Sequence, residues 1–436
     1  MFLKEHIPYK IVLVYFAICI LSACTGYNSG QKSFINEDTP KTLSGKFTLD
    51  AQVIPPAAIQ SVQLYPGSVE TAPPVIALNG GQSLTLEFDY LSTQVEQFNI
   101  SVSHRNKNWQ ESAIGPSVYL DRFFEASFGD GRKSFEQNPP YHHYTYRFPN
   151  QRLSLTKSGN YLLSVFEYGS DELLFSLPFF VSEDRGTLET RIERLFAQRD
   201  DGRSLAQPFS DYRYPGFVQQ PQFDLSFAYV QNQFWGRMRY PDFFDTATPG
   251  IVHFHLERRK AFIADYEFNL LDLRSFNPDG RQIIDIQPGQ TPPIVTLRRD
   301  VQQFESTPNR FPGPALGLPN DDLRAQYGRI KFSFNPISTV NSNEEIYLVG
   351  QFNNWVIDPR FRMRFDSTAA LWKTDALIKQ GLYAYKYVRV DEEKMDDLAF
   401  DQSFTNSRQE YLTFVYYRDP QQNFDRLLKV ERTTPK

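Results

Sequence analysis

The sequence is poor in cysteine. Its 436 residues include two, Cys19 and Cys24, and both lie close to the N-terminus. No residue after position 24 can therefore act as a cysteine nucleophile, hold zinc through a thiolate or bind an iron–sulfur cluster. The sequence also contains no Gly-x-Ser-x-Gly motif, no phosphate-binding loop and no dinucleotide fingerprint. These absences exclude several large classes of enzyme, and we expect a protein without catalytic activity.

An excess of charge of one sign is also lacking. The formal net charge is -5, from 46 basic and 51 acidic residues, and removal of residues 1–23 would change it to -6 (44 basic against 50 acidic). A weak and mixed charge argues against nucleic acid or an anionic lipid surface as the main partner. Beyond the N-terminal region, no run of residues is apolar enough to cross a membrane.

A short basic and apolar leader is present at the N-terminus. Lys4 and Lys10 carry its positive end. A run of about eleven apolar residues, Ile11–Leu21, comes next, and it is too short to span a bilayer and has the length of a signal-peptide core. Leu21-Ser22-Ala23-Cys24 follows and resembles the lipobox of bacterial lipoproteins, whose cysteine is acylated on sulfur and becomes the first mature residue. We therefore predict a signal peptide over residues 1–23 and lipid attachment at Cys24. An ordinary secretory peptide with a chance cysteine is the alternative.

A polar segment follows the lipobox. Residues 24–45 are rich in Ser, Gly, Asn and Thr, which predicts a flexible tether between the lipid and the folded body. The first acidic residues after Cys24 are Glu37 and Asp38. An acidic run directly after the lipid-bearing cysteine resembles a surface-export signal, and this chain lacks one. The expected location is therefore the periplasm, with the protein tethered to the inner face of the outer membrane.

Aromatic residues are abundant. They make up 15% of the chain, with 38 Phe and 24 Tyr, and 29 prolines interrupt the sequence. This composition and the scarcity of long helical patterns predict an all-β fold. Alternation with a period of two supports it, because Leu84, Leu86 and Phe88 would share one face of a strand over residues 83–89. Several such segments separated by turns predict a β-sandwich domain over residues 46–183.

Two further domains are predicted. Alternating segments at 223–230 and 251–256 indicate a middle β-sandwich domain over residues 184–323. The proline-containing stretch Asn309–Asn320 near its end resembles an interdomain connector. In the C-terminal domain, residues 328–436, a strand leads into the turn Gln351-Phe352-Asn353-Asn354-Trp355. This order resembles the early-set immunoglobulin-like modules near starch-processing enzymes and energy-sensing kinases, so the prediction is a tandem of β-sandwiches ending in such a module.

Candidate catalytic and metal-binding residues are sparse. His253 and His255 would share a strand face, and such a pair can bind a metal, but no carboxylate stands at a convincing ligand spacing. The adjacent pair His142-His143 would face opposite sides of a strand. Glu87 and Asp89 share the face opposite the apolar residues of their strand and are predicted to be solvated. The sequence therefore predicts neither a catalytic site nor a metal site.

Residues 208–223 combine many aromatic rings with prolines. Alternation cannot bury all of these rings on one sheet face, so some must line a domain junction or be exposed. Exposed aromatic rings are common at protein interfaces, where they bury a large area at low entropic cost. Our hypothesis is that Tyr212, Tyr214 and Phe217 bind a partner, and the alternative is that they fill a junction between domains.

Several short motifs occur together in the order that one known family shows. They are Pro74-Val75-Ile76-Ala77-Leu78, Leu86–Leu91, Tyr144–Asn150 with Ser158–Leu163, Tyr266–Phe268 with Asp272–Ser275, Lys379–Tyr383 and Val415–Arg418. Through them the chain resembles the Plug protein family of the type IX secretion system of Bacteroidetes-like bacteria, over roughly residues 60–432. Asn269 stands where the family usually has arginine, and His104-Arg105-Asn106 replaces a His-Cys-Asp step. These departures indicate that the chain comes from an outlying branch of the family.

The resemblance implies a function without chemistry. A protein of this family sits at the periplasmic mouth of a giant outer-membrane β-barrel translocon and closes the pore when no cargo is in transit. The implied partner is the barrel subunit, with no cofactor, nucleic acid or small-molecule substrate. Reversible closure suits a moderate, partly polar interface. A lipid tether through Cys24 would raise the effective concentration of the plug near the barrel.

Two other functions remain open. Tryptophans at 109, 235, 355 and 372 could stack on sugar rings, and the turn around Trp355 suggests a periplasmic glycan-binding lipoprotein. That function predicts an exposed Trp355 or Trp372, whereas core packing is the alternative for both rings. The last possibility is a cell-envelope scaffold without a pore partner.

Overall fold

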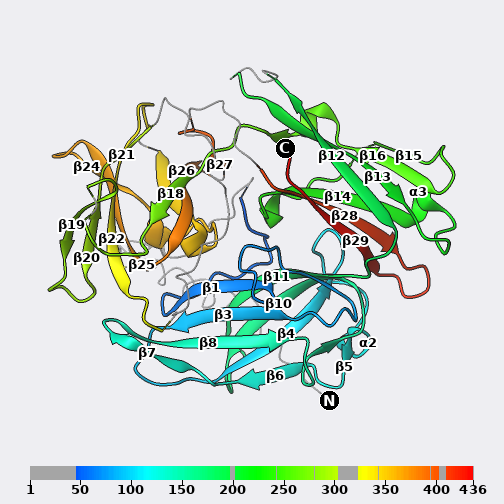
Figure 1. Ribbon diagram of the computed structural model, residues 1–436, viewed down its shortest axis with the longest axis horizontal. Coiled ribbons are helices and arrows are strands. Elements are labelled where there is room, and N and C mark those ends of the chain that lie inside the picture. The colour runs from blue at the N-terminus through cyan, green and yellow to red at the C-terminus, as the bar shows by residue number, and fades with distance from the viewer. Residues whose placement is uncertain are drawn as a thin grey trace, which may run out of the picture. The chain divides into compact units, whose positions relative to one another are not determined.

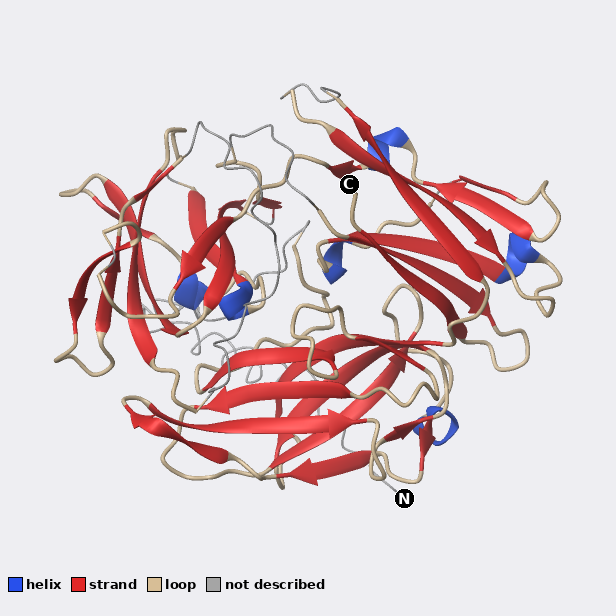
Figure 2. Ribbon diagram, in the orientation of Figure 1, coloured by secondary structure: helices blue, strands red, loops and turns tan. Residues whose placement is uncertain are grey.

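The computed structural model describes residues 46–435 apart from 197–201, 242, 279, 303–322, 342, 393 and 402–408. The predicted signal peptide, Cys24, the tether and the connector Asn309–Asn320 lie outside the described residues. The described chain consists mainly of β-strands and turns (Figure 2), which confirms the all-β prediction. Its α-helices are single turns, α2 (Pro116–Tyr119) and α3 (Pro221–Asp224). In this part of the chain, no helix has the length and apolar character needed to cross a bilayer.

The first β-sandwich contains residues 59–182. One sheet has the order β1 (Ile59–Pro66), β3 (Leu84–Tyr90), β8 (Pro140–Phe148) and β7 (Arg132–Gln137). The other has the order β2 (Val75–Ala77), β11 (Leu173–Ser182), β10 (Gly159–Glu167), β4 (Phe98–Arg105) and β6 (Glu125–Phe128). Two short strands, β5 (Leu120–Asp121) and β9 (Ser154–Leu155), pair beside them.

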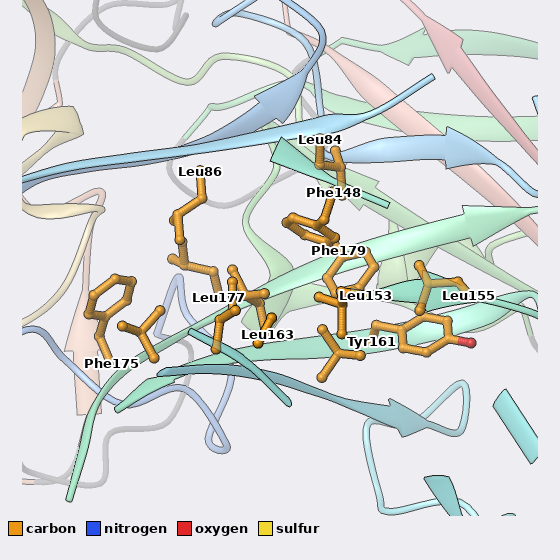
Figure 3. Close-up of a cluster of buried hydrophobic side chains, with 14 of the residues drawn as sticks. Leu84, Leu86, Phe148, Leu153, Leu155, Tyr161, Leu163, Phe175, Leu177 and Phe179 are labelled. Carbon is orange, nitrogen blue, oxygen red and sulfur yellow. The ribbon is translucent and has the colours of Figure 1, made fainter. Parts of the chain in front are cut away.

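Alternating apolar residues build the core of this sandwich. Leu84, Leu86 and Phe88 are completely buried, as the period-two pattern predicted. In Figure 3 the side chains of Leu84, Leu86 and Phe148 meet those of the opposite sheet. The rings of Phe148 and Phe179 lie 5.3 Å apart in an edge-on arrangement, one of the geometries that aromatic pairs prefer.

A second sandwich joins segments from the middle and the end of the chain. One sheet has the order β12 (Thr187–Leu195), β13 (Leu205–Arg213), β16 (Ile251–His255) and β15 (Phe243–Asp245), and β17 (Phe262–Ile263) also pairs with β13. The other sheet has the order β14 (Leu225–Gln231), β28 (Tyr411–Arg418) and β29 (Asp425–Thr433), which run side by side in Figure 1. The stacked rings of Phe227 and Phe254, with centroids 3.8 Å apart, connect the two sheets through one core.

The third sandwich lies between these segments in the sequence. One sheet has the order β18 (Asn269–Asp272), β26 (Leu382–Asp391) and β23 (Glu344–Gly350), with β27 (Lys394–Asp396) paired to β26. The other has the order β19 (Ile283–Gln287), β20 (Ile294–Leu297), β22 (Tyr327–Asn335), β25 (Leu371–Lys379) and β24 (Arg364–Asp366), with β21 (Asp300–Val301) paired to β22. Their shared core includes the stacked pair Phe334 and Tyr387.

Strand pairing groups the elements differently from the predicted domains 184–323 and 328–436. β18, β19 and β20 precede residue 323 but pair with strands of the third sandwich. β28 and β29 follow residue 328 but pair with β14. Alternation identifies a strand and its buried face but carries no information about a partner about 190 residues away. The early-set immunoglobulin-like topology of the C-terminal module stays a prediction.

Candidate functional site

The structure separates the three aromatic residues that the sequence analysis proposed for partner binding. Tyr212 faces inward on β13, is completely buried, and donates a hydrogen bond of 2.8 Å to the carbonyl of Arg185. Tyr214 is half-buried and packs against the same core. Phe217 is 41% exposed, with its ring edge-on to Tyr417 at 5.4 Å. Of these three rings, Phe217 therefore offers a substantial surface to a partner.

The histidine pairs have local partners. His253 Nδ1 lies 2.6 Å from Asp211 Oδ1 on the neighbouring strand, and His255 lies between the rings of Phe209 and Phe243, at 5.1 Å from each. No cluster of three or more His, Cys, Asp or Glu residues that could hold a metal ion occurs within the described parts of the chain.

The tryptophans pack against other side chains. Trp355 is half-buried, and its ring lies 5.8, 5.4 and 5.1 Å from Phe47, Phe234 and Phe268. Trp372 is also half-buried and lies 5.5 Å from the exposed ring of Phe365. Each of these two rings is therefore partly covered by neighbouring aromatic side chains.

A buried ionic cluster joins the first and third sandwiches at Asp89. Cross-strand pairing places Asp89 opposite His143, and the imidazole Nδ1 lies 2.8 Å from the carboxylate Oδ1. Lys379 Nζ lies 2.8 Å from the other carboxylate oxygen. Tyr327 donates to that same oxygen at 2.6 Å, and its hydroxyl lies 2.8 Å from Ser61 Oγ. Residues from β1, β3 and β8 thus meet the ends of β22 and β25.

The prediction of a solvated face at Glu87 and Asp89 is wrong. Alternation correctly places Asp89 away from the core of its own sandwich, but the third sandwich covers that face. The Asp89 side chain has no exposed surface, and Glu87 retains 17%. The charged residues of β3 were visible in the sequence, whereas the packing that buries them was not.

Electrostatics keep the cluster ionised. Burial would raise the pKa of the Asp89 carboxyl, but the nearby charges of Lys379 and His143 outweigh it and hold that pKa below its usual value. Burial would likewise lower the pKa of His143, whereas hydrogen bonds to Asp89 and Glu87 raise it to about 9. At neutral pH two cations therefore oppose two carboxylates. This balance suits a structural clamp, because both charges of the Asp89–Lys379 pair are compensated in the interior.

The segment that precedes β1 contacts all three sandwiches. The Phe47 ring lies 4.3 Å from Phe234 of the second sandwich. Val53 exchanges hydrogen bonds with Ser176 of the first sandwich, at 2.8 Å from its backbone N–H to the serine Oγ. Arg360 of the third sandwich donates to the Pro55 carbonyl at 3.0 Å. We call residues 46–58 the N-terminal strap.

A cavity of about 190 Å³ lies beside the clamp and the strap. Three sandwiches and the strap contribute to its wall, so it exists only where they meet. Its polar wall residues are Thr48, Gln52, Gln60, Ser61, Gln63, Glu70, Asn232, Gln233, Gln351, Asn354 and Lys379. Its aromatic wall residues are Phe47, Phe234, Trp235, Tyr327, Phe352, Trp355 and Tyr383. The sequence analysis named several of these residues, but it did not bring them together.

Comparison with known proteins agrees with the fold. A crystal structure of a hypothetical protein from Parabacteroides merdae matches with a TM-score of 0.78 at 22% identity, over 88% of this chain and 98% of that chain. This likeness shows a shared fold. The C-terminal domain of the AgI/II polypeptide BspA of Streptococcus agalactiae covers 85% of this chain and 98% of its own at 8% identity, but its TM-score of 0.17 is too low to support an argument. No curated protein matches the chain.

The first sandwich matches a known domain family. Residues 59–183 match the family model described as Type 9 secretion system plug protein 1st domain. The matched range coincides with the two sheets from β1 to β11. The chain therefore carries a domain that matches the first domain of type 9 secretion system plug proteins, which confirms the family resemblance over these residues.

Proposed function

We propose that this chain is a periplasmic plug that closes the mouth of the giant outer-membrane β-barrel translocon of a type IX secretion system when no cargo is in transit. The observation that carries the proposal is the match of the first sandwich to the first domain of plug proteins. Closing a pore requires binding and steric exclusion, so the function needs no catalytic group, cofactor or small-molecule substrate.

A rigid body supports this role, since a cover over a wide aqueous pore must resist deformation. Three features join the sandwiches: the buried Asp89–Lys379 pair, the strap, and the packing of Phe180 of the first sandwich against Phe414 of the second. Breaking any one of them would leave a buried charge or an uncovered core. Independent rotation of the sandwiches is therefore costly.

Reversible contact with the barrel suits the exposed aromatic residue Phe217. Its ring stands beside Arg426, whose guanidinium lies 5.1 Å from the ring centroid. Aromatic and arginine side chains are enriched among the residues that dominate binding energy. We propose Phe217, together with the half-buried Tyr214, as part of the partner-binding surface, while Tyr212 holds the strand beneath it.

The lipid tether completes the proposed arrangement. Acylation at Cys24 would hold the protein in the periplasm at the inner face of the outer membrane. The tether of residues 24–45 would confine the plug close to the barrel, so that a modest affinity suffices for closure.

The test is a purification from the native organism. A tag after Lys436 and extraction in mild detergent should recover a giant outer-membrane barrel in near-equal amount. Recovery of the protein alone would favour the cell-envelope scaffold, and recovery with envelope polysaccharide would favour the glycan-binding lipoprotein. Either result would contradict the plug function.

A further inference from the structure

The cavity between the sandwiches contains a polar group that the fold leaves unsatisfied. The side-chain amides of Gln52, Gln63 and Asn354 line the cavity, and all three residues are half-buried. The Gln52 Oε1 atom is fully enclosed and still unpaired. Unsatisfied buried polar groups are rare in folded proteins, because each costs the free energy of its lost hydration. The enclosed Gln52 Oε1 atom therefore indicates that a group other than the described residues satisfies it, and the half-buried amides of Gln63 and Asn354 open into the same cavity.

These amides come from separate parts of the chain. Gln52 belongs to the strap, Gln63 to β1 and Asn354 to the turn after β23. Asn354 adopts a left-handed backbone conformation, with φ of 53°, at the end of the short 3-10 helix η3 (Gln351–Asn353). Each side-chain amide has an NH2 group that donates and an oxygen that accepts. Three amides from three parts of the chain can therefore bind several hydroxyl groups of one molecule.

Aromatic rings provide the other part of the wall. Trp235, Trp355 and Phe352 line the same cavity. Ligand sites combine apolar and aromatic walls with a few polar groups that fix orientation. A pyranose ring matches this combination, since its hydroxyls bind amides while its C–H groups pack on aromatic rings.

The charge of the wall and the volume of the cavity restrict the class of ligand further. The ammonium of Lys379 is already opposed by Asp89, and Glu70 takes part in an interaction of its own. The wall therefore offers no unopposed charge for an ionic ligand. A cavity of about 150 Å³ can accept benzene, so one of about 190 Å³ has room for one six-membered ring with small substituents.

We infer that this cavity binds one neutral sugar ring through Gln52, Gln63 and Asn354. The strap forms one wall, so binding would fasten residues 46–58 to the body. The inference does not depend on the plug function, because it can be tested on the purified protein without the barrel.

The probes are N-acetyl-D-glucosamine and D-glucose, added to the purified full chain, and the readout is tryptophan fluorescence. Two of the four tryptophans line the cavity, so a bound sugar should change the signal in a saturable manner. Glucuronate, which carries a charge, should bind more weakly than either neutral sugar.

Asn354→Gly is the decisive variant, because glycine keeps the left-handed backbone and removes the amide. It should weaken binding of the neutral sugars about tenfold. Asn423→Gly is the matched control, since Asn423 is exposed, has a φ of 56° and lies outside the cavity wall. Gln63→Leu gives a second cavity variant with similar volume, and melting temperatures would verify that each variant is folded.

Saturable binding that falls in Asn354→Gly and Gln63→Leu but not in Asn423→Gly would establish the site. The inference fails if neither neutral sugar produces a saturable change. It also fails if both folded cavity variants bind as tightly as the parent protein, because the sugar would then lie elsewhere.

Discussion

The ammonium of Lys379 lies 2.8 Å from the carboxylate of Asp89, although 290 residues separate them in the sequence. The lysine side chain is 8% exposed and that of the aspartate has no exposed surface. The pair connects β3 of the first sandwich to β25 of the third. Because each charge compensates the other in the interior, loss of either partner leaves the remaining charge buried with less compensation, which is destabilising.

Lys379→Met should therefore destabilise the protein strongly. It leaves the Asp89 carboxylate buried without its lysine, and we expect the free energy of unfolding to fall by about 3–5 kcal/mol in urea denaturation. Arg329→Met is a matched control on the same sheet, because its ion pair with Asp375 is about half exposed on both sides. That control should change stability by less than about 1 kcal/mol. Equal effects of the two substitutions would contradict the clamp.

Alkaline pH should weaken the same cluster. The folded-state pKa of His143 is raised from 6.5 to about 9. Its stabilising contribution is complete below pH 6.5 and is lost as the pH rises towards 9, with a slope of at most about 1.4 kcal/mol per pH unit. His143→Gln should flatten the stability profile between these values. An unchanged slope in His143→Gln would assign the effect to another group.

A methyl group at Gly236 should displace the strap. A Cβ atom there would lie 2.2 Å from the carbonyl oxygen of Thr48, whereas one at Gly216 would meet nothing within 4 Å. We expect Gly236→Ala to cost about 1–3 kcal/mol and to speed limited proteolysis within residues 46–58. Gly216→Ala should behave as the parent protein. A strap that stays protected in Gly236→Ala would mean that the contact with η1 (Trp235–Arg237) is dispensable.

Tyr212 and Phe217 should respond oppositely to substitution by serine. Tyr212→Ser removes a fully buried ring and should lower the free energy of unfolding by about 3–5 kcal/mol. Phe217→Ser should leave the melting temperature close to that of the parent and weaken capture of the barrel by about 2 kcal/mol, close to thirtyfold. Co-purification and calorimetry on both variants separate these effects. Undiminished capture by Phe217→Ser would remove this residue from the proposed interface.

Cys24→Ser tests the lipid anchor. Without the thiol there is no acylation site, so the protein should move from the membrane fraction to the soluble periplasm. Washing the membranes in high salt removes proteins held only by charge, which isolates the contribution of the lipid. Retention of Cys24→Ser in washed membranes would show that lipid attachment is not the anchor.

The sequence predicted local structure better than it predicted assembly. Leu84, Leu86 and Phe88 occupy the buried face that alternation assigned to them, because a strand's two faces follow from its geometry alone. The same rule placed Asp89 on the other face but could not show that β22 and β25 cover it. The position of Tyr212 could not be predicted either. Its place in an aromatic stretch of the sequence did not show that its side chain faces inward on β13.

Assembly depends on contacts between distant segments. His143 pairs with Asp89 across one sheet, and Lys379 reaches them from another sandwich. No periodicity in the sequence encodes such a meeting. The cavity was unpredictable for the same reason, since Gln52, Gln63 and Asn354 each look like ordinary polar residues in separate local elements.

The pairing of β14 with β28 also sets an order of events during synthesis and export. Residues 225–231 emerge long before residues 411–418, so β14 must wait for its sheet partner while the first sandwich can already fold. Until the end of the chain arrives, the edge of β14 is open to pairing with other chains. A copy interrupted before residue 411 would keep that edge exposed and be recognisable to proteases and chaperones. The second sandwich is therefore complete only once residues 411–433 are present.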